Sequence, residues 1–195
     1  MKQYHKKRDF DRISEPFGSD KRKDGQNIFV IQKHDASNVH FDFRLEVDGV
    51  LKSWAIPKGP STDPRVKRLA IPTEDHPIEY ADFEGTIPDD QYGDGTVMVW
   101  DAGTYKNLKE DDDRKSVPMQ LKDGHITIWL SGKKLSGGYA IIRTGKGADE
   151  RWLLVKMDDE EADARRNPVS TENKSVLSNR TMDQIEKDAK QRGDE

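Results

Sequence analysis

The stretch VHFDFRLEVDGVLKSWAI, which runs from Val39 to Ile56, decides the fold class. Apolar and polar residues alternate strictly from Val39 to Val47, and this is the period of a β-strand with one buried and one polar face. Asp48-Gly49 then separates this run from a second one, and Asp-Gly between two such runs predicts a tight hairpin. The stretch is therefore expected to form two antiparallel strands, at 40–47 and 50–56.

Short runs of the same kind continue on both sides of this hairpin. Glycine-containing segments separate them, as is typical of turns between strands. Further strands are expected at 27–34, 68–74, 95–100, 125–130, 139–143 and 151–156. Many short strands joined by such turns favour a barrel or a sandwich, so the chain is expected to be mostly β. Short helices are expected only at 116–122 and 181–192, with Thr181 as the N-cap of the second.

The composition changes along the chain and predicts three parts. Residues 1–25 are basic and polar, with Pro16 and Gly18 as breakers, and are expected to form an N-terminal arm, either flexible or ordered. Residues 26–158 carry the expected strands and form the compact β-domain. Residues 159–195 are acidic and then mixed in charge, and are expected to form a polar C-terminal tail, either helical in part or disordered.

Composition also excludes several classes of function. Charged residues make up 36% of the chain, against about 25% in an average domain. Cysteine is absent, which excludes disulfides and thiolate chemistry. The net charge of −4 argues against a broad basic surface, so a nucleic-acid partner would need a local basic site. The start of the chain is charged and no apolar run has the length of a membrane helix, so we expect no signal peptide, no membrane partner and a cytoplasmic location.

The polar face of the 39–47 strand carries ligands of the kind that bind metals. Residues two apart on a strand lie about 6.5–7 Å apart at Cα, so His40 and Asp42 can bind one ion. A turn at 35–38 would bring His34 beside His40 and complete a set of two histidines and one carboxylate with open coordination positions. Arg44 follows within reach of an anion on that ion. The same pattern also fits the solvated face of an amphipathic strand.

A second segment carries a similar set of side chains. Arg68, Ala70, Pro72, Glu74 and His76 share one parity, so they are expected on one face of a strand. If this strand faces the first one inside a barrel, the site contains a metal triad, two guanidiniums and a third imidazole. Such a site suits phosphoryl chemistry, because the metal and the arginines neutralise phosphate oxygens and the imidazole can donate a proton to a leaving group.

Several motifs, in this order along the chain, resemble the 3′-phosphoesterase module of bacterial DNA ligase D. They are KRDFDRISEP (Lys7–Pro16), FVIQKHDASNVHFDFRLEVDGVLKSWAIPKGPS (Phe29–Ser61), RLAIPTEDHPIEYADFEGTIP (Arg68–Pro88), Tyr92-Gly93 with GTVMVWD (Gly95–Asp101), and SVLSNRTMDQI (Ser175–Ile185). The resemblance covers nearly the whole chain. The chain lacks room for ligase and polymerase domains, so it looks like a stand-alone form of the module.

The resemblance implies a fold and an activity. The fold would be a small antiparallel β-barrel with at most one or two short helices, polar tails and a polar active site. The enzyme would need one divalent metal, most often Mn²⁺, with Zn²⁺, Co²⁺ or another transition metal as alternatives. It would remove a terminal 3′ ribonucleoside as a phosphodiesterase and then the 3′ phosphate as a phosphomonoesterase. The product would be a 3′-OH end for ligation in non-homologous end joining.

Matching positions imply roles for individual residues. The family's metal ligands correspond to His34, His40 and Asp42. Its catalytic and phosphate-contacting positions correspond to Arg44, Arg68, Glu74 and His76, and we expect His76 to be the general acid. Its further substrate-binding positions correspond to Gln32 and Tyr80 and, in an arm that folds back over the site, to Arg8, Asp9 and Glu15. The chain departs from the family at Ser37-Asn38, where two arginines are common, and this weakens one basic contact.

The expected partners are the 3′ ends of DNA or RNA/DNA primer–templates, together with a separate ligase, polymerase or end-binding protein. Two other functions remain as alternatives. Two histidines and a carboxylate also bind iron in oxygenases, although two arginines and His76 have no clear use there. The chain can also be an end-binding module without catalysis, although such a module would not need the complete set of metal-type and phosphate-type residues.

Overall fold

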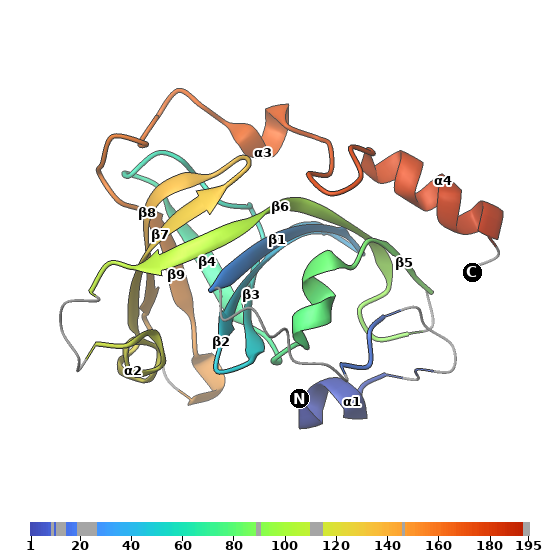
Figure 1. Cartoon of the computed structure of the whole chain (residues 1–195), viewed down its shortest axis with the longest axis horizontal. Coiled ribbons are helices and arrows are strands. Elements are labelled where there is room, and N and C mark those ends of the chain that lie inside the picture. Colours follow the sequence, from blue (N-terminus) through green and yellow to red (C-terminus); the bar gives the residue numbers. More distant parts are fainter. Residues whose placement is uncertain are drawn as a thin grey trace.

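Nine strands in the computed structural model form one antiparallel sheet that closes into a barrel (Figure 1). The structure describes residues 1–8, 10, 15–18, 27–88, 91–109, 115–145 and 147–192. The strand order is β1-β2-β3-β4-β9-β8-β7-β6-β5, and an additional β1–β6 pairing closes eight strands into the barrel, leaving β5 outside. The strands are β1 (Ile28–Asp35), β2 (Val39–Val47), β3 (Val50–Ile56), β4 (Lys67–Pro72), β5 (Gly85–Ile87), β6 (Gly95–Asn107), β7 (His125–Gly132), β8 (Ser136–Arg143) and β9 (Trp152–Lys156).

The predicted hairpin is present between β2 and β3. Val47 pairs with Val50 across the turn. Asp48 and Gly49 have φ values of 54° and 78°, and positive φ at both central residues is what a tight two-residue hairpin turn requires. The predicted β-barrel is therefore confirmed, with strand ends shifted by a few residues. The exceptions are β6, which continues past Trp100 to Asn107, and β5, which is too short to show a period.

The barrel wall separates two apolar clusters. The inner one contains side chains from all eight barrel strands, among them Phe43 from β2 and Trp100 from β6. The outer one lies on the other face of β1, β3 and β6, where Val30 and Val99 are buried under a second layer. This layer consists of β5, the N-terminal helix α1 (Lys2–Lys6) and the 3₁₀ helix η1 (Ile78–Asp82), which lie on the same side of the barrel in Figure 1.

The remaining helices are short. They are α2 (Val117–Asp123), α3 (Pro168–Thr171), α4 (Met182–Arg192) and the 3₁₀ helix η2 (Gly147–Asp149). α2 and α4 agree with the two predicted helices, whereas α1 and α3 have no counterpart in the sequence-based prediction. Gln184 N donates to Thr181 Oγ1 at 3.4 Å and Thr181 N donates to Gln184 Oε1 at 2.9 Å, a reciprocal cap of α4. Among the described residues, no helix is both long and apolar enough to cross a membrane.

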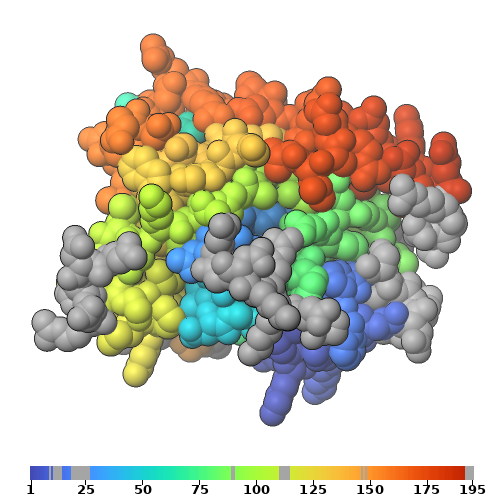
Figure 2. Space-filling view, viewed as in Figure 1, coloured from blue at the N-terminus to red at the C-terminus, as the bar shows by residue number. Residues whose placement is uncertain are grey.

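Both ends of the described chain pack against the barrel. In the N-terminal part, Tyr4 is fully buried and its hydroxyl donates to the Pro16 carbonyl at 2.7 Å. In the C-terminal part, the Trp100 indole donates to the Glu172 carbonyl at 2.6 Å, and Ile185 of α4 is buried in the inner cluster. Figure 2 shows the C-terminal segment, orange to red, along one side of the molecule and the dark blue α1 on the opposite side.

Candidate active site

The β1–β2 pairing brings the predicted metal ligands together. His34 is the Cα partner of His40, and Gln32 is the partner of Asp42. Directly opposite residues on an antiparallel pair have Cβ atoms about 4.5–5.5 Å apart, which places both imidazoles on one side of the sheet. The prediction that the 35–38 stretch turns His34 back beside His40 is therefore confirmed. These side chains occupy the outer face of the barrel wall, since Phe43 on the same strand points into the inner cluster.

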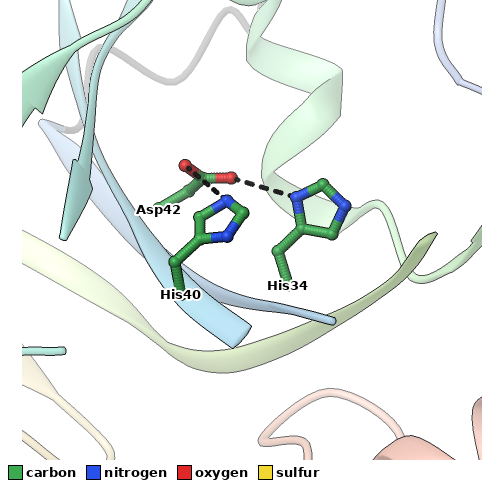
Figure 3. A group of neighbouring side chains, drawn as sticks. All are labelled: His34, His40 and Asp42. Carbon is green, nitrogen blue, oxygen red and sulfur yellow. Dashed lines mark ion pairs between the residues drawn. The ribbon is translucent and has the colours of Figure 1, made fainter. Parts of the chain in front are cut away.

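Three ligand atoms point at one another in this cluster (Figure 3). His34 Nδ1 lies 3.8 Å from Asp42 Oδ2, and His40 Nε2 lies 3.9 Å from Asp42 Oδ1. All three ligand atoms lie within 4.8 Å of one another. Two atoms bonded to one transition-metal ion at about 2.0–2.2 Å lie at most about 4.4 Å apart, so the 3.8 and 3.9 Å separations fit a single ion. The set leaves open coordination positions, as expected where an ion also has to contact a substrate.

Backbone carbonyls hold both imidazoles in the orientation that metal binding needs. His34 Nε2 donates to the Asp94 carbonyl at 3.1 Å, and His40 Nδ1 donates to the Asn38 carbonyl at 3.0 Å. Each bond leaves the lone pair of the other ring nitrogen facing Asp42. Burial lowers the pKa of His34, which favours the neutral form that can bind an ion. This is the donor arrangement typical of metal-binding histidines, so the residues present fit a divalent metal.

Arg44 lies next to the cluster and is almost fully buried. Its Nη2 donates to Asp42 Oδ2 at 3.0 Å, and its Nε donates to Gln32 Oε1 at 2.8 Å. The Gln32 amide in turn donates to the carbonyls of Tyr80 and Phe83 at 2.9 and 3.1 Å. The Arg44 guanidinium also lies 4.9 Å from the centre of the Tyr80 ring. Gln32 and Tyr80 are themselves buried, and they fix the position of the guanidinium beside a candidate metal ligand.

His76 packs against the other side of Arg44. Its Nδ1 donates to the Glu74 carbonyl at 2.8 Å, which leaves Nε2 as an acceptor. Arg44 Nη1 lies 3.3 Å from this Nε2, and Arg8 Nη2 lies 3.4 Å from it. Burial, followed by the charges of Arg44 and Arg8, holds the pKa of His76 well below its ordinary value. The imidazole is therefore neutral in this arrangement.

An extra residue after β4 brings His76 to the outer face. Pro72 pairs with Trp54, whose side chain is in the inner cluster, and His76 pairs with Leu51, whose side chain is in the outer cluster. The chain advances four residues from Pro72 to His76, whereas the paired strand β3 advances only three residues between Trp54 and Leu51. Such an irregularity reverses the alternation of faces. The prediction that the alternate residues Arg68, Ala70, Pro72, Glu74 and His76 share one face is wrong for this reason.

Arg68 lies before this reversal. Its neighbour on the same face, Ala70, belongs to the inner cluster, whereas Arg44 lies on the outer face. The Arg68 Nε is buried and has no hydrogen-bond partner among the described residues. The structure thus brings Arg44, Glu74 and His76 together, but the strand register assigns Arg68 to the opposite face of the wall.

The N-terminal arm reaches the site through Glu74. Arg8 Nη1 donates to Glu74 Oε1 at 3.0 Å, and Lys7 Nζ donates to Glu74 Oε2 at 3.1 Å. Arg8 Nε also donates to Glu15 Oε2 at 2.8 Å. Although burial raises the pKa of Glu74, the hydrogen bonds from Arg8 and Lys7 outweigh it, and the pKa lies below its ordinary value. Asp9, the third predicted residue of the arm, lies outside the described residues.

Three contributors to the site were missed by sequence reasoning. Asp94 acts through its carbonyl, which no side-chain pattern reveals. Lys7 and Tyr92 meet across 85 positions of sequence, with Lys7 Nζ donating to the Tyr92 hydroxyl at 2.9 Å. The signal near them was Gly93 and Gly95, whose positive φ values of 82° and 116° shape the turn before β6. A Cβ on Gly95 would collide with the Asp35 carbonyl, so this turn needs glycine.

The comparisons with known proteins agree with this geometry. Residues 32–143 match the family model described as the DNA ligase D 3′-phosphoesterase domain. The chain is 49% identical over 187 residues to the multifunctional non-homologous end joining protein LigD of Pseudomonas aeruginosa, covering 93% of this chain and 22% of that protein. It is 44% identical over 161 residues to the multifunctional non-homologous end joining DNA repair protein LigD of Mycobacterium tuberculosis, covering 82% and 20%.

The chain thus spans about a fifth of the length of these relatives. The matched family segment begins at Gln32, includes the cluster of His34, His40 and Asp42, and ends at Arg143 at the end of β8. It covers more than half of the chain, and the resemblance inferred from the motifs is confirmed. The chain belongs to the DNA ligase D 3′-phosphoesterase domain family.

Proposed function

We propose that this chain is a metal-dependent phosphoesterase that processes 3′ ends in DNA repair. Membership of the family supports 3′-end processing as the general function and hydrolysis as the reaction class. The finer proposal is a 3′-ribonucleoside phosphodiesterase that is also a 3′-phosphomonoesterase and leaves a 3′-OH end. The observation that carries it is the contact between Arg44 and Asp42, which joins a guanidinium to the candidate metal ligands at 3.0 Å.

His34, His40 and Asp42 would hold one divalent ion, with Mn²⁺ as our first choice and Zn²⁺ or Co²⁺ as alternatives. When bound, such an ion supplies Lewis-acid polarisation of a phosphoryl oxygen. The same ligand set binds iron in oxygenases, but a buried guanidinium beside the ligands favours a phosphate substrate. Arg44 is positioned to neutralise a phosphoryl oxygen, and Gln32 and Tyr80 keep it there. Arg68 would have to act from the other face, so its catalytic role is the least supported.

His76 is proposed to donate the proton to the leaving group. Burial, followed by the charges of Arg44 and Arg8, holds its pKa well below the ordinary value. A bound phosphate would offset the charges of Arg44 and Arg8, so proton uptake by His76 would accompany substrate binding. Glu74 would position Arg8 and Lys7 and would not touch the substrate, since both of its oxygens bind the arm. Glu15, which accepts a hydrogen bond from Arg8, is proposed to serve the arm in the same way, and Asp9 keeps the substrate-binding role that its family position implies.

The proposed substrates are the 3′ ends of DNA or RNA/DNA primer–templates in the cytoplasm. A separate ligase, polymerase or end-binding protein would use the product. The net charge of −4 suits a few phosphate contacts at one end better than a grip on a long duplex, so binding should be sensitive to salt.

The test uses two primer–templates, one with a single terminal ribonucleotide and a 3′ phosphate and one with two terminal ribonucleotides. Each is incubated with protein and Mn²⁺, with and without EDTA, and the products are resolved on a sequencing gel. We expect a metal-dependent 3′-OH end from the first and a strand shortened by one nucleotide from the second. If a folded, metal-loaded protein gives no product but still binds these ends, the chain is an end-binding module and the proposed function is wrong.

A further inference from the structure

An exposed tyrosine stands at the edge of the site without a role in the mechanism above. Tyr92 lies in the turn before β6 and is 49% exposed. Hydrogen bonds from Gln91 N to the Pro88 carbonyl and from Asp94 N to the Gln91 carbonyl close this turn. Two residues after Tyr92, the Asp94 carbonyl holds His34 at 3.1 Å. The tyrosine is therefore tied through the backbone to a candidate metal ligand.

The arm meets the same tyrosine from the other side. Lys7 Nζ donates to the Tyr92 hydroxyl at 2.9 Å and lies 4.2 Å from the centre of the ring. The Arg8 guanidinium lies 5.6 Å from the ring centre, and its Nη2 is 3.4 Å from His76 Nε2. The Arg8 guanidinium is therefore near both the Tyr92 ring and the His76 imidazole, which is proposed to protonate the leaving group.

An aromatic ring at this position is suited to a base. The cations of the site, Arg44 and Arg8, account for recognition of phosphate, but a nucleoside next to that phosphate offers only its sugar and its base. Single-stranded bases are commonly bound by stacking on aromatic side chains, and this stacking tolerates every base. Tyr92 is absent from both apolar clusters, and its ring contacts the cations of Lys7 and Arg8 while remaining 49% exposed.

We propose that Tyr92 stacks on the base of the terminal nucleoside that the phosphodiesterase step removes. The inference rests on the proposed function and adds a specificity-determining residue to it. The Lys7–Tyr92 bond joins the arm to the turn before β6 at one edge of the site. The terminal nucleoside is bonded to the reacting phosphate, so it is the part of the primer that would reach Tyr92 at this edge. The phosphomonoesterase step, which has no leaving nucleoside, does not use this contact.

The first test measures stacking without catalysis. A primer whose terminal ribonucleoside is 2-aminopurine is bound to the protein in EDTA, and its fluorescence is recorded. Stacking on an aromatic ring quenches this base, so wild type and Tyr92→Phe should quench it and Tyr92→Ala should not. Equal quenching by Tyr92→Ala and wild type overturns the proposal. Because no turnover is involved, this result is independent of the proposed reaction.

The second test compares substrates in the presence of Mn²⁺. Tyr92→Ala should raise the KM for removal of a terminal ribonucleoside by about 5- to 150-fold, the range expected for one stacked base. A terminal abasic ribose should raise the wild-type KM by the same factor and remove the difference between wild type and Tyr92→Ala. The ratio of phosphodiesterase to phosphomonoesterase kcat/KM should fall accordingly in Tyr92→Ala.

Leu108→Ala is the matched control, because Leu108 is 44% exposed and follows the other end of β6. It should behave as wild type on every substrate. The proposal is overturned if Tyr92→Ala loses phosphodiesterase and phosphomonoesterase activity equally. It is also overturned if Tyr92→Ala is less active than wild type on the abasic substrate. Wild-type protein without turnover of either substrate would instead contradict the proposed function, while the fluorescence test would still decide the role of Tyr92.

Discussion

The two faces of β2 differ in chemistry although they alternate residue by residue. Toward the barrel interior, Phe43 packs among aromatic and aliphatic side chains. Toward the outside, Asp42 and Arg44 on either side of it belong to a hydrogen-bonded polar network. Adjacent residues on this strand therefore have different roles. Substitutions on the outer face should affect activity and those on the inner face should affect stability.

The largest effect is expected on the outer face, from loss of a candidate ligand. His40→Ala removes an imidazole that is not part of the core, so turnover should fall below detection while the melting temperature stays close to that of wild type. Metal content after dialysis, activity on both primer–templates and thermal unfolding check this. His125→Ala is the control, because His125 is an exposed histidine on β7. Near-normal activity of His40→Ala would refute the metal assignment.

His76→Gln should show whether the outer face supplies a proton. Loss of a general acid costs about 10²–10⁴-fold in rate when the leaving group is an ordinary alcohol. A substrate with a nitrophenyl leaving group on the 3′ phosphate needs no proton, so the variant should retain most of its activity there. The measurement is kcat on both substrates. An equal loss on both would mean that His76 only positions Arg44.

Phe43→Ala tests the division between the two faces from the inner side of the barrel. The ring is buried and lies 6.3 Å from the Phe29 ring and 6.4 Å from the Trp54 ring, so the variant leaves a cavity in the barrel. We expect a loss of about 3–5 kcal/mol in the free energy of unfolding, measured in urea. At a temperature where the variant is fully folded, kcat should remain within a few-fold of wild type. A fully folded but inactive variant would contradict the division between the two faces.

The smallest effect concerns the attachment of the arm. Because the folded state lowers the pKa of Glu74 below its ordinary value of 4.5, ionised Glu74 stabilises the fold above that pH. This contribution is lost as the pH falls through the lowered pKa. Glu74→Gln should therefore cost about 1–3 kcal/mol at pH 7 and progressively less in acid. Urea unfolding of wild type and Glu74→Gln across this pH range measures the difference in the free energy of unfolding, and limited proteolysis reports on the arm. A free-energy difference that does not change with pH would contradict the assignment.

Local patterns predicted the inner and outer faces of β2 and its hairpin, because alternation and the Asp48-Gly49 turn act over neighbouring residues. They also predicted that His34 and His40 meet. The prediction failed where one residue changes the register, as between Pro72 and His76, since alternation is read on the assumption of an uninterrupted strand. It also could not reveal that the site lies outside the barrel interior. That location depends on the second layer of η1, β5 and α1, whose burial of Val30 and Val99 is a long-range effect.

The position of β1 in the sheet has a thermodynamic consequence. β1 is the strand at which the barrel closes, and His34 is paired with His40 on one side and with Val97 of β6 on the other. Opening this seam would separate His34 from the Asp94 carbonyl that orients its ring, but not from His40, because β1 stays paired with β2. Barrel closure is thus linked to the orientation of one candidate ligand. An ion that needs this orientation and binds only the closed form would stabilise it by about 2.7 kcal/mol when its concentration is about a hundred times its dissociation constant.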